Sequence, residues 1–317
     1  MPVVDAKALF AHAIKRDYAL AAFNISSLDS LQAVLWAAEA EASPVIVQVL
    51  RLTEEYVRDV ETYLDAVRLY AGRCKVPVLL QHDHCSSVEE AKLAIDRGFG
   101  AVMYDGSSLS FEENAANSAE VARYAHERGV WLEAELGSIP GMEDNCFTDR
   151  VEYTSPELAR RFISETGCDS LAVSVGTAHG GVAGNEHLPL DFDRLEALVC
   201  ACPGYPLVLH GAASMPDALR EYVNLYGGSI APVHICSEAD IARACRSGVR
   251  KANMDVDNWL AYTGALRQFF SERPGEFFPT SYLEFARNAW ENEVRHKLRK
   301  VVCSSGMATD FYGGTGK

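Results

Sequence analysis

The sequence alternates short apolar runs with helix-forming segments, and this alternation constrains the fold more than any other feature. Amphipathic patterns of the length that a parallel crossover needs include residues 30–41, 54–71, 88–97, 111–127 and 156–166. They separate eight runs with the composition of buried strands: residues 20–23, 45–50, 76–81, 101–104, 130–135, 170–174, 206–210 and 251–255. Eight βα units predict an α/β fold of the (β/α)8 TIM barrel type.

The alternative architecture is an open, doubly wound sheet, because one miscounted strand would change the closure. No Gly-x-Gly-x-x-Gly turn follows the first apolar run, which disfavours that alternative. We expect residues 1–317 to form a single barrel domain. A helix over residues 280–302 would extend beyond the eight units and contribute to subunit contact.

Two stretches lack the pattern of a helix or strand, residues 137–153 and 225–233, and we expect loops there. The first follows the fifth apolar run directly. It would therefore lie over the carboxyl face of the barrel, where barrel enzymes carry out their chemistry. We expect residues 137–153 to be a mobile active-site loop.

The charge and cysteine content exclude several classes of function. The chain has 29 basic and 44 acidic residues, a net charge of −15, which repels nucleic acid and anionic membrane surfaces. No apolar run approaches the length of a membrane span. The nine cysteines are odd in number and lack paired spacing, which predicts no disulfide framework and fits a reducing cytoplasm.

Polar residues gather where several predicted strands end, which is where a barrel enzyme places functional side chains. The third run leads into residues 81–84 (Gln-His-Asp-His), the sixth leads into His179, and the seventh ends in His210. Three histidines from three strand ends are typical of a catalytic metal site with an open position. His82 and His84 alternate across their strand, and periodicity alone does not decide which of them binds metal.

Seven motifs carry a resemblance to a known family. They are Ala-Phe-Asn at 22–24, Asp-His at 83–84, Tyr-Asp-Gly-Ser at 104–107, Glu-Ala-Glu-Leu-Gly at 133–137, Gly-Thr-Ala-His-Gly at 176–180, Leu-His-Gly at 209–211 and Asn-Met-Asp at 253–255. In this order, across nearly the whole chain, they resemble class II fructose-bisphosphate and tagatose-bisphosphate aldolases. The resemblance implies a carbon–carbon lyase of carbohydrate metabolism and glycolysis that acts on a small sugar or sugar phosphate.

The resemblance also implies a role for individual residues. His84, His179 and His210 would bind Zn²⁺ or another divalent ion, with Asp105 and Glu135 at an alternative metal position, and a monovalent cation is a further candidate cofactor. Asp83 would transfer the hydroxyl proton, and Glu143 in the loop would exchange the proton at the enediolate carbon. Substrate contacts would come from Asn24, Gly180, Gly211, Asn253 and Asp255. Family members imply a homodimer or homotetramer.

The chain departs from the family pattern at the residues that bind phosphate. Ala213 and Val256 stand where a serine and a threonine or serine are usual, and Trp259 and Thr280 stand where arginines are usual. Leu50 replaces a serine, and the neighbouring Arg51 offers a new anion contact. Charge-assisted contacts are worth about 1.5–3 kcal/mol each. We therefore expect altered phosphate recognition, with one end of the substrate facing Trp259.

Other functions are compatible with parts of this pattern. An ordinary fructose- or tagatose-1,6-bisphosphate aldolase would need phosphate contacts from elsewhere. A class I aldolase would use a Schiff-base lysine, for which Lys251 is the candidate. A metal-dependent isomerase or epimerase also uses an enediolate, and a non-catalytic sugar-binding scaffold would tolerate the lost phosphate ligands.

Overall fold

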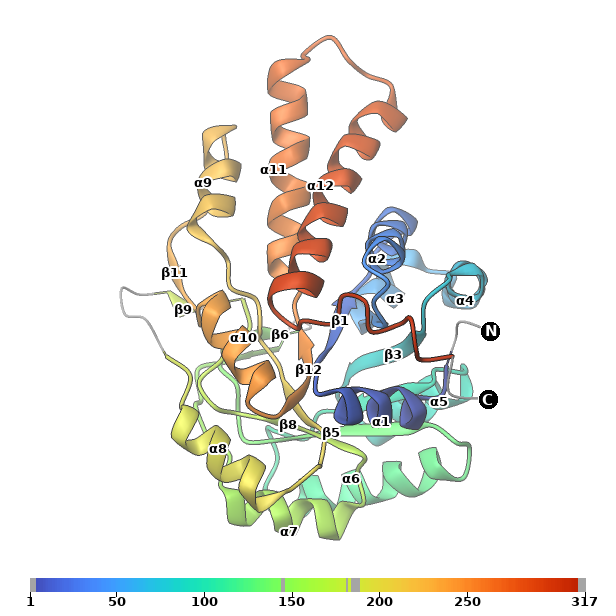
Figure 1. The fold of residues 1–317 in the computed structure, drawn as a ribbon, viewed down its shortest axis with the longest axis vertical. Helices are drawn as coiled ribbons and strands as arrows, with labels where there is room; N and C mark the ends of the chain where they lie inside the picture. Colours follow the sequence, from blue (N-terminus) through green and yellow to red (C-terminus); the bar gives the residue numbers. More distant parts are fainter. Residues whose placement is uncertain (1–3, 144–145, 181, 184–188, 313–317) are drawn as a thin grey trace.

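The computed structural model describes residues 4–143, 146–180, 182–183 and 189–312. Eight parallel strands close into a barrel in the order β1-β12-β10-β8-β5-β4-β3-β2 (Figure 1). The strands are β1 (Leu20–Asn24), β2 (Val45–Val49), β3 (Val78–Cys85), β4 (Ala101–Tyr104), β5 (Trp131–Leu136), β8 (Ser170–Val173), β10 (Leu207–Leu209) and β12 (Val249–Asn253). Each overlaps one predicted run, and β1 pairs with both β2 and β12. The TIM barrel prediction is therefore confirmed, and the open-sheet alternative is wrong.

Helices surround the barrel on the outside (Figure 1). They are α2 (Leu28–Ala40), α3 (Arg51–Val57), α4 (Val60–Arg73), α5 (Val88–Asp96), α6 (Phe111–His126), α7 (Pro156–Thr166), α8 (Phe192–Ala201), α9 (Asp217–Leu225), α10 (Glu238–Arg246) and α11 (Val256–Glu272). Side chains cap many of the helix starts. Ser27 and Ser110, for example, form capping boxes at α2 and α6.

The helix predicted over residues 54–71 is two helices, and the single-helix prediction is wrong. The chain breaks at Arg58, whose φ of +62° is left-handed and cannot continue an α-helix. The next residue, Asp59, accepts a hydrogen bond from the Thr62 N–H at 3.2 Å and starts α4. Aspartate is a preferred N-cap residue, so the break has a local cause.

The stretch 137–153 is not irregular throughout, as we had expected from the sequence. It contains a hairpin of β6 (Gly141–Glu143) and β7 (Cys146–Thr148), with Gly141 opposite Thr148. Most of the stretch 225–233 is a loop, as predicted. It leads from α9 into β11 (Val233–His234), which pairs with β9 (Val182–Ala183).

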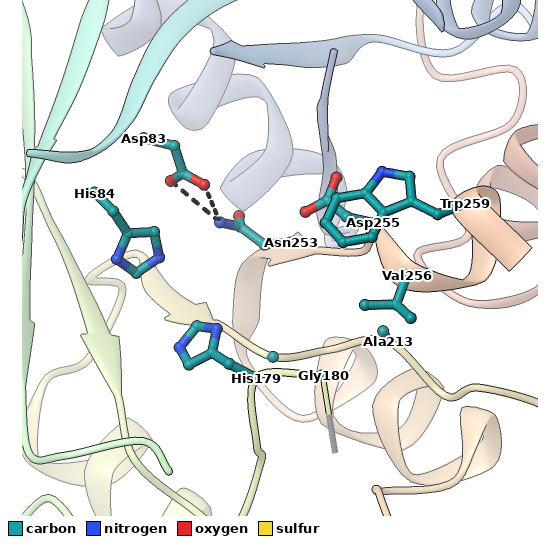
Figure 2. Close-up of a pocket in the computed structure, with 10 residues that line it drawn as sticks. Asp83, His84, His179, Gly180, Ala213, Asn253, Asp255, Val256 and Trp259 are labelled. Carbon is teal, nitrogen blue, oxygen red and sulfur yellow. Dashed lines mark hydrogen bonds between the residues drawn. The ribbon is translucent and has the colours of Figure 1, made fainter. Parts of the chain in front are cut away.

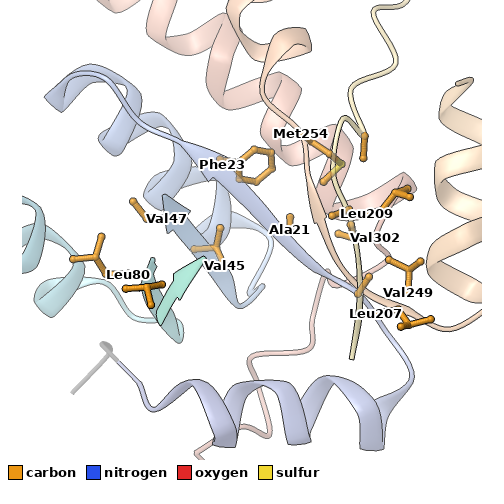
Figure 3. Close-up of a cluster of buried hydrophobic side chains, with 14 of the residues drawn as sticks. Ala21, Phe23, Val45, Val47, Leu80, Leu207, Leu209, Val249, Met254 and Val302 are labelled. Atoms are coloured by element: carbon orange, nitrogen blue, oxygen red, sulfur yellow. The ribbon is translucent and has the colours of Figure 1, made fainter. Parts of the chain in front are cut away.

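Alternate residues of the barrel strands belong to two different environments. In β1, Ala21 and Phe23 pack outward in the large cluster shared with the helices (Figure 3), whereas Leu20 and Ala22 pack in a second, inner cluster. The next inward residue, Asn24, is buried and hydrogen-bonds to other polar side chains. The inward face therefore changes from apolar near the amino ends of the strands to polar near their carboxyl ends.

Two helices lie outside the eight βα units. At the amino end of the barrel, α1 (Ala6–Arg16) packs against the inner cluster, and its Phe10 ring stacks on Trp131 at 4.5 Å. The predicted C-terminal extension is α12 (Pro279–Lys300), which packs against α11 and α2. Together, α11 and α12 stand away from the barrel (Figure 1). Across the described residues, no helix is both long and apolar enough to cross a membrane.

Candidate active site

The backbone of β3 determines which of His82 and His84 points toward the other histidines at the carboxyl end of the barrel. The pairing of β3 with β4 changes register between His82 and Cys85. His84 has a left-handed φ of +48°, a conformation that is costly for a non-glycine residue. This bend turns the His84 ring toward His210, with ring centroids 4.7 Å apart. His82 instead lies edge-on to Phe99. Of the two histidines, His84 is thus the one that reaches the carboxyl end of the barrel.

Three histidines meet at this end of the barrel: His84, His179 and His210. One ring nitrogen from each lies within 4.8 Å of the others, and all three side chains are buried. A second group, formed by His84, Asp105 and Glu135, has the same spacing. Neutral imidazoles and carboxylates at this separation fit a divalent transition metal. The donor set is therefore suited to the ion that the sequence predicted, with a neighbouring alternative position.

Carboxylates orient two of these rings. Asp105 Oδ2 lies 3.0 Å from His84 Nδ1, and Glu133 Oε1 lies 2.9 Å from His210 Nε2. A histidine whose one nitrogen meets a carboxylate presents the other nitrogen to a metal. His210 Nδ1 lies 3.2 Å from Glu135 Oε2, an ion-pair distance when the ring is protonated. His210 therefore faces a carboxylate at each ring nitrogen, Glu133 at Nε2 and Glu135 at Nδ1.

Glu133 is itself held by Lys251, whose Nζ donates to Glu133 Oε1 at 2.7 Å. Both side chains are fully buried inside the barrel. Burial alone would raise the pKa of Glu133, but the Lys251 ammonium and the His210 ring together lower it to about 2. Glu133 therefore stays ionised as the partner of His210. The amine of Lys251 has a structural ion-pair partner, which argues against a role as a Schiff-base nucleophile.

Asp83 is surrounded by side-chain amides. Gln48 Nε2 donates to Oδ1 at 2.8 Å, and Asn24 Nδ2 donates to Oδ2 at 3.0 Å. Asn253 Nδ2 lies 3.2 Å from Oδ2, as Figure 2 shows. Asn24 also donates from its backbone and its side chain to Asp255. These amide donors fix the position of the Asp83 carboxylate. The donors come from three neighbouring strands, β1, β2 and β12, so closure of the barrel sets the orientation of this carboxylate.

The pocket next to Asp83 contains most of the predicted substrate residues (Figure 2). Its lining is Asp83, His84, His179, Gly180, Gly211, Ala213, Asn253, Asp255, Val256 and Trp259. Among these described lining residues there is no lysine or arginine, and the sequence over residues 181–188 contains none either. The pocket therefore contains few of the charged groups that usually bind phosphate.

Some predicted site residues lie elsewhere. Leu50 precedes α3 and Arg51 begins it, and the Arg51 guanidinium pairs with Glu55 at 2.5 Å on the surface. Neither residue is part of the pocket lining described above. Thr280 is exposed at the start of α12. Glu143 belongs to β6, and its side chain lies outside the described residues.

Sequence reasoning gave no role to Gln48 and Glu133, and considered Lys251 only as a nucleophile. A signal for Gln48 was present, because it is a polar residue within the apolar run 45–50. Glu133 and Lys251 lie near the middle of their strands, facing inward. Their pairing across the barrel depends on which strands face one another, and one sequence does not give that information.

Comparison with known proteins decides the family. The family model "Fructose-bisphosphate aldolase class-II" matches residues 4–307. The chain belongs to the class II fructose-bisphosphate aldolase family. It is therefore a metal-dependent aldolase, a carbon–carbon lyase, as the motifs had indicated.

Relatives cover almost the whole of this aldolase. It is 36% identical to a fructose-bisphosphate aldolase of Treponema pallidum, over 96% of this chain and 98% of the relative. It is 34% identical to a fructose-bisphosphate aldolase of Giardia intestinalis, over 98% and 96%. Among solved structures, the YdjI aldolase from Escherichia coli K12 is similar, with a TM-score of 0.75, 28% identity, and coverage of 96% of this chain and 99% of that one.

Gly141 links the hairpin of β6 and β7 in this aldolase to His179, one of the three clustered histidines, and Gly141→Ala is expected to lower kcat/KM by about 100-fold. The Gly141 φ is +120°, and an added Cβ would lie 2.0 Å from the His179 carbonyl oxygen. A displacement of about 1 Å at a catalytic group can cost this factor. Steady-state cleavage kinetics measure the effect.

Gly129→Ala is the matched control, because Gly129 also has a positive φ, of +70°, but open space around its Cβ position. The control should lose some stability and keep its activity. If both variants lost activity equally, contact with His179 would not be the cause.

Proposed function

We propose that this aldolase reversibly cleaves a ketose or ketose phosphate to dihydroxyacetone, or its phosphate, and an aldehyde, with altered phosphate recognition. The observation that carries the proposal is the pocket wall formed by Ala213, Val256 and Trp259. These residues offer neither hydroxyl nor guanidinium groups where aldolases of this family use them. A substrate that lacks the distal phosphate, with an apolar, shorter or differently charged end, suits this wall.

We propose zinc as the resident ion, held by His84, His179 and His210, although iron, cobalt or manganese suit the same donors. When bound, a divalent ion supplies Lewis-acid stabilisation of the negative charge that develops as the carbon–carbon bond breaks. Asp105 and Glu135 would provide the alternative metal position. A monovalent cation remains a proposed second cofactor, carried over from the family.

In this proposal Asp83 accepts the proton of the substrate hydroxyl next to the breaking bond. Its three amide donors hold the carboxylate toward the pocket and leave it able to take a proton. Glu143 would exchange the proton at the carbon that becomes the methylene of dihydroxyacetone. Support for that role comes from the position of β6, because Gly141 bridges to His179.

The remaining pocket residues would orient the substrate. Asn253 and Asp255 offer amide and carboxylate groups to its hydroxyls, and Asn24, outside the described pocket lining, would act by holding Asp83 and Asp255. Backbone amides near Gly180, Gly211 and Ala213 would hold a single phosphate, because consecutive amides in a turn bind anions without a cationic side chain. Trp259 is 43% exposed and lines the pocket, so it would face the other end of the substrate.

A second candidate function is ordinary fructose 1,6-bisphosphate or tagatose 1,6-bisphosphate cleavage. It is favoured by the relatives, which are named fructose-bisphosphate aldolase and match along nearly their full length. A non-catalytic scaffold has less support, because it would not need Asp83 and the three histidines together.

We further propose a cytoplasmic homodimer or homotetramer, with a net charge that disfavours nucleic-acid and membrane partners. Support for subunit contact comes from α12, which stands away from the barrel beside α11 (Figure 1). At its start, Phe277 and Phe278 are 86% and 60% exposed. Large exposed aromatic side chains of this kind are enriched at protein interfaces.

A substrate panel tests the proposal directly. Zinc-loaded protein would be given fructose 1,6-bisphosphate, fructose 1-phosphate and unphosphorylated ketoses, with a chelator-treated sample alongside. We expect higher kcat/KM for a ketose without the distal phosphate. Faster cleavage of the bisphosphate would refute altered recognition and support the ordinary aldolase. Product analysis separates cleavage from isomerisation or epimerisation.

Restoring the missing groups should shift this preference. The combined variant Ala213→Ser, Val256→Thr and Trp259→Arg is expected to raise kcat/KM for the bisphosphate about tenfold or more relative to fructose 1-phosphate. One charge-assisted hydrogen bond accounts for a factor of this size. Tyr56→Arg is the control, because Tyr56 is a 74% exposed aromatic in α3 outside the described pocket lining. A similar gain in the control would point to net charge rather than to the pocket.

A further inference from the structure

A buried ion cluster lies behind the turn that follows β10, away from the metal site. Its centre is Lys297 on α12, which is 1% exposed. The Lys297 Nζ lies 2.6 Å from Asp257 Oδ2, 2.9 Å from Glu238 Oε2 and 3.3 Å from Glu293 Oε1. It also donates to Ser214 Oγ at 3.2 Å. A helix outside the eight βα units thus reaches the starts of α10 and α11.

The charge of Lys297 is maintained by these neighbours. Burial alone would lower its pKa, but Asp257, Glu293 and Glu238 together raise it above its usual value. Asp257 is fully buried, so its carboxylate depends on this ammonium for compensation. Lys297 and Asp257 therefore form a buried ion pair that connects α12 to α11.

Asp257 uses both carboxylate oxygens to fix the turn after β10. Its Oδ2 accepts hydrogen bonds from the Ser214 N–H at 3.0 Å and the Ser214 hydroxyl at 2.8 Å. Its Oδ1 accepts from the Met215 N–H at 2.6 Å. Met215 has a left-handed φ of +37°, a conformation that persists only where the surroundings enforce it. The hydrogen bonds to Asp257 hold Met215 in this conformation.

The same turn forms one wall of the pocket. Ala213, directly before Ser214, and Gly211 both line it, as does Val256 directly before Asp257. Gly211 also packs on the backbone of Ala178, the residue before His179, where an added Cβ would lie 2.7 Å from the Ala178 carbonyl. A shift of the turn would therefore move the proposed anion-binding amides. It would also displace the backbone of Ala178, next to His179.

We propose that Lys297, acting through Asp257, is a positioning residue that holds residues 211–215 in the conformation that lines the pocket. Only one part of this inference rests on the proposed function, namely that the backbone amides of the turn bind an anion. Lys297 does not line the pocket, so its effect on catalysis would be indirect.

The test compares Lys297→Met, Lys297→Arg and the control Lys300→Met in the metal-loaded protein. Lys300 lies on the same helix and is exposed. Hydrogen–deuterium exchange of the peptide over residues 210–216 measures how well the backbone amides of the turn are protected. Inhibition by inorganic phosphate, together with separate values of kcat and KM, measures the effect of each substitution on the pocket. Asp257→Asn is the second variant, for use if Lys297→Met does not fold.

We expect Lys297→Met to expose the turn to exchange and to raise both KM and the inhibition constant of phosphate at least about tenfold. Its kcat should fall less, and Lys297→Arg should recover most of the protection. Folded Lys297→Met or Asp257→Asn with wild-type protection of the turn would overturn the proposal. Loss of protection with unchanged phosphate inhibition would support the positioning role and count against the proposed anion site.

Discussion

Replacing Asp83 with asparagine is expected to lower kcat for cleavage by about 10²–10⁴-fold, the usual contribution of a positioned proton-transfer group. The side chain keeps its size, so the pocket keeps its shape. It loses the charge that accepts the proton, and its new amide group meets the donors of Gln48, Asn24 and Asn253. The measurement is single-turnover cleavage of the best substrate in the panel.

Two readouts distinguish lost chemistry from lost structure in the Asp83 variant. Metal content, measured by elemental analysis, should remain that of the wild type, because three histidines still supply the proposed ligands. Asp65→Asn is the matched control, since Asp65 lies on α4 with a side chain that is 79% exposed. An Asp83→Asn protein with wild-type kcat would exclude Asp83 as the proton-transfer residue.

Removal of the metal should have an equally large effect. Chelation is expected to abolish cleavage. His179→Ala should lower metal affinity by more than about 100-fold, because loss of a residue that only hydrogen-bonds to a metal ligand already costs up to about that factor. The reason is that the group of nitrogens within 4.8 Å loses one of its three members. Competition with a chromophoric chelator measures the affinity, independently of activity.

His126→Ala is the matched control for this experiment. His126 lies at the end of α6, half-exposed, and contacts Asp169 near the amino end of the barrel. Its removal should leave metal content and activity unchanged. If His179→Ala retained wild-type metal affinity, the ion would have to be bound by other groups, such as His84, Asp105 and Glu135.

The fold could be predicted because its signals are local. Each barrel strand overlaps a run that the sequence predicted, and the count of these runs favoured the closed barrel over the open sheet. Details that depend on single backbone conformations were not predicted. The left-handed Arg58 divides one predicted helix into α3 and α4, and the turn after β5 contains the hairpin of β6 and β7.

The candidate site was partly accessible from the sequence for a different reason. Histidines at strand ends could be recognised because all carboxyl ends of a parallel barrel face the same side. The choice of His84 over His82 required the bend in β3, and the pairing of Glu133 with Lys251 required strands that are far apart in sequence. Such contacts follow from barrel closure and tertiary packing, which periodicity does not report.

The graded interior of the barrel has a consequence for how such an enzyme diverges. Leu20, Ala22 and Ile46 pack near the amino end, whereas the three clustered histidines and the pocket lie at the opposite end. Folding stability and substrate choice therefore depend on largely separate sets of positions. If the proposed function holds, exchanges at pocket residues such as Ala213 and Trp259 would alter which sugar is accepted while the framework remains intact, and selection would act on specificity one residue at a time.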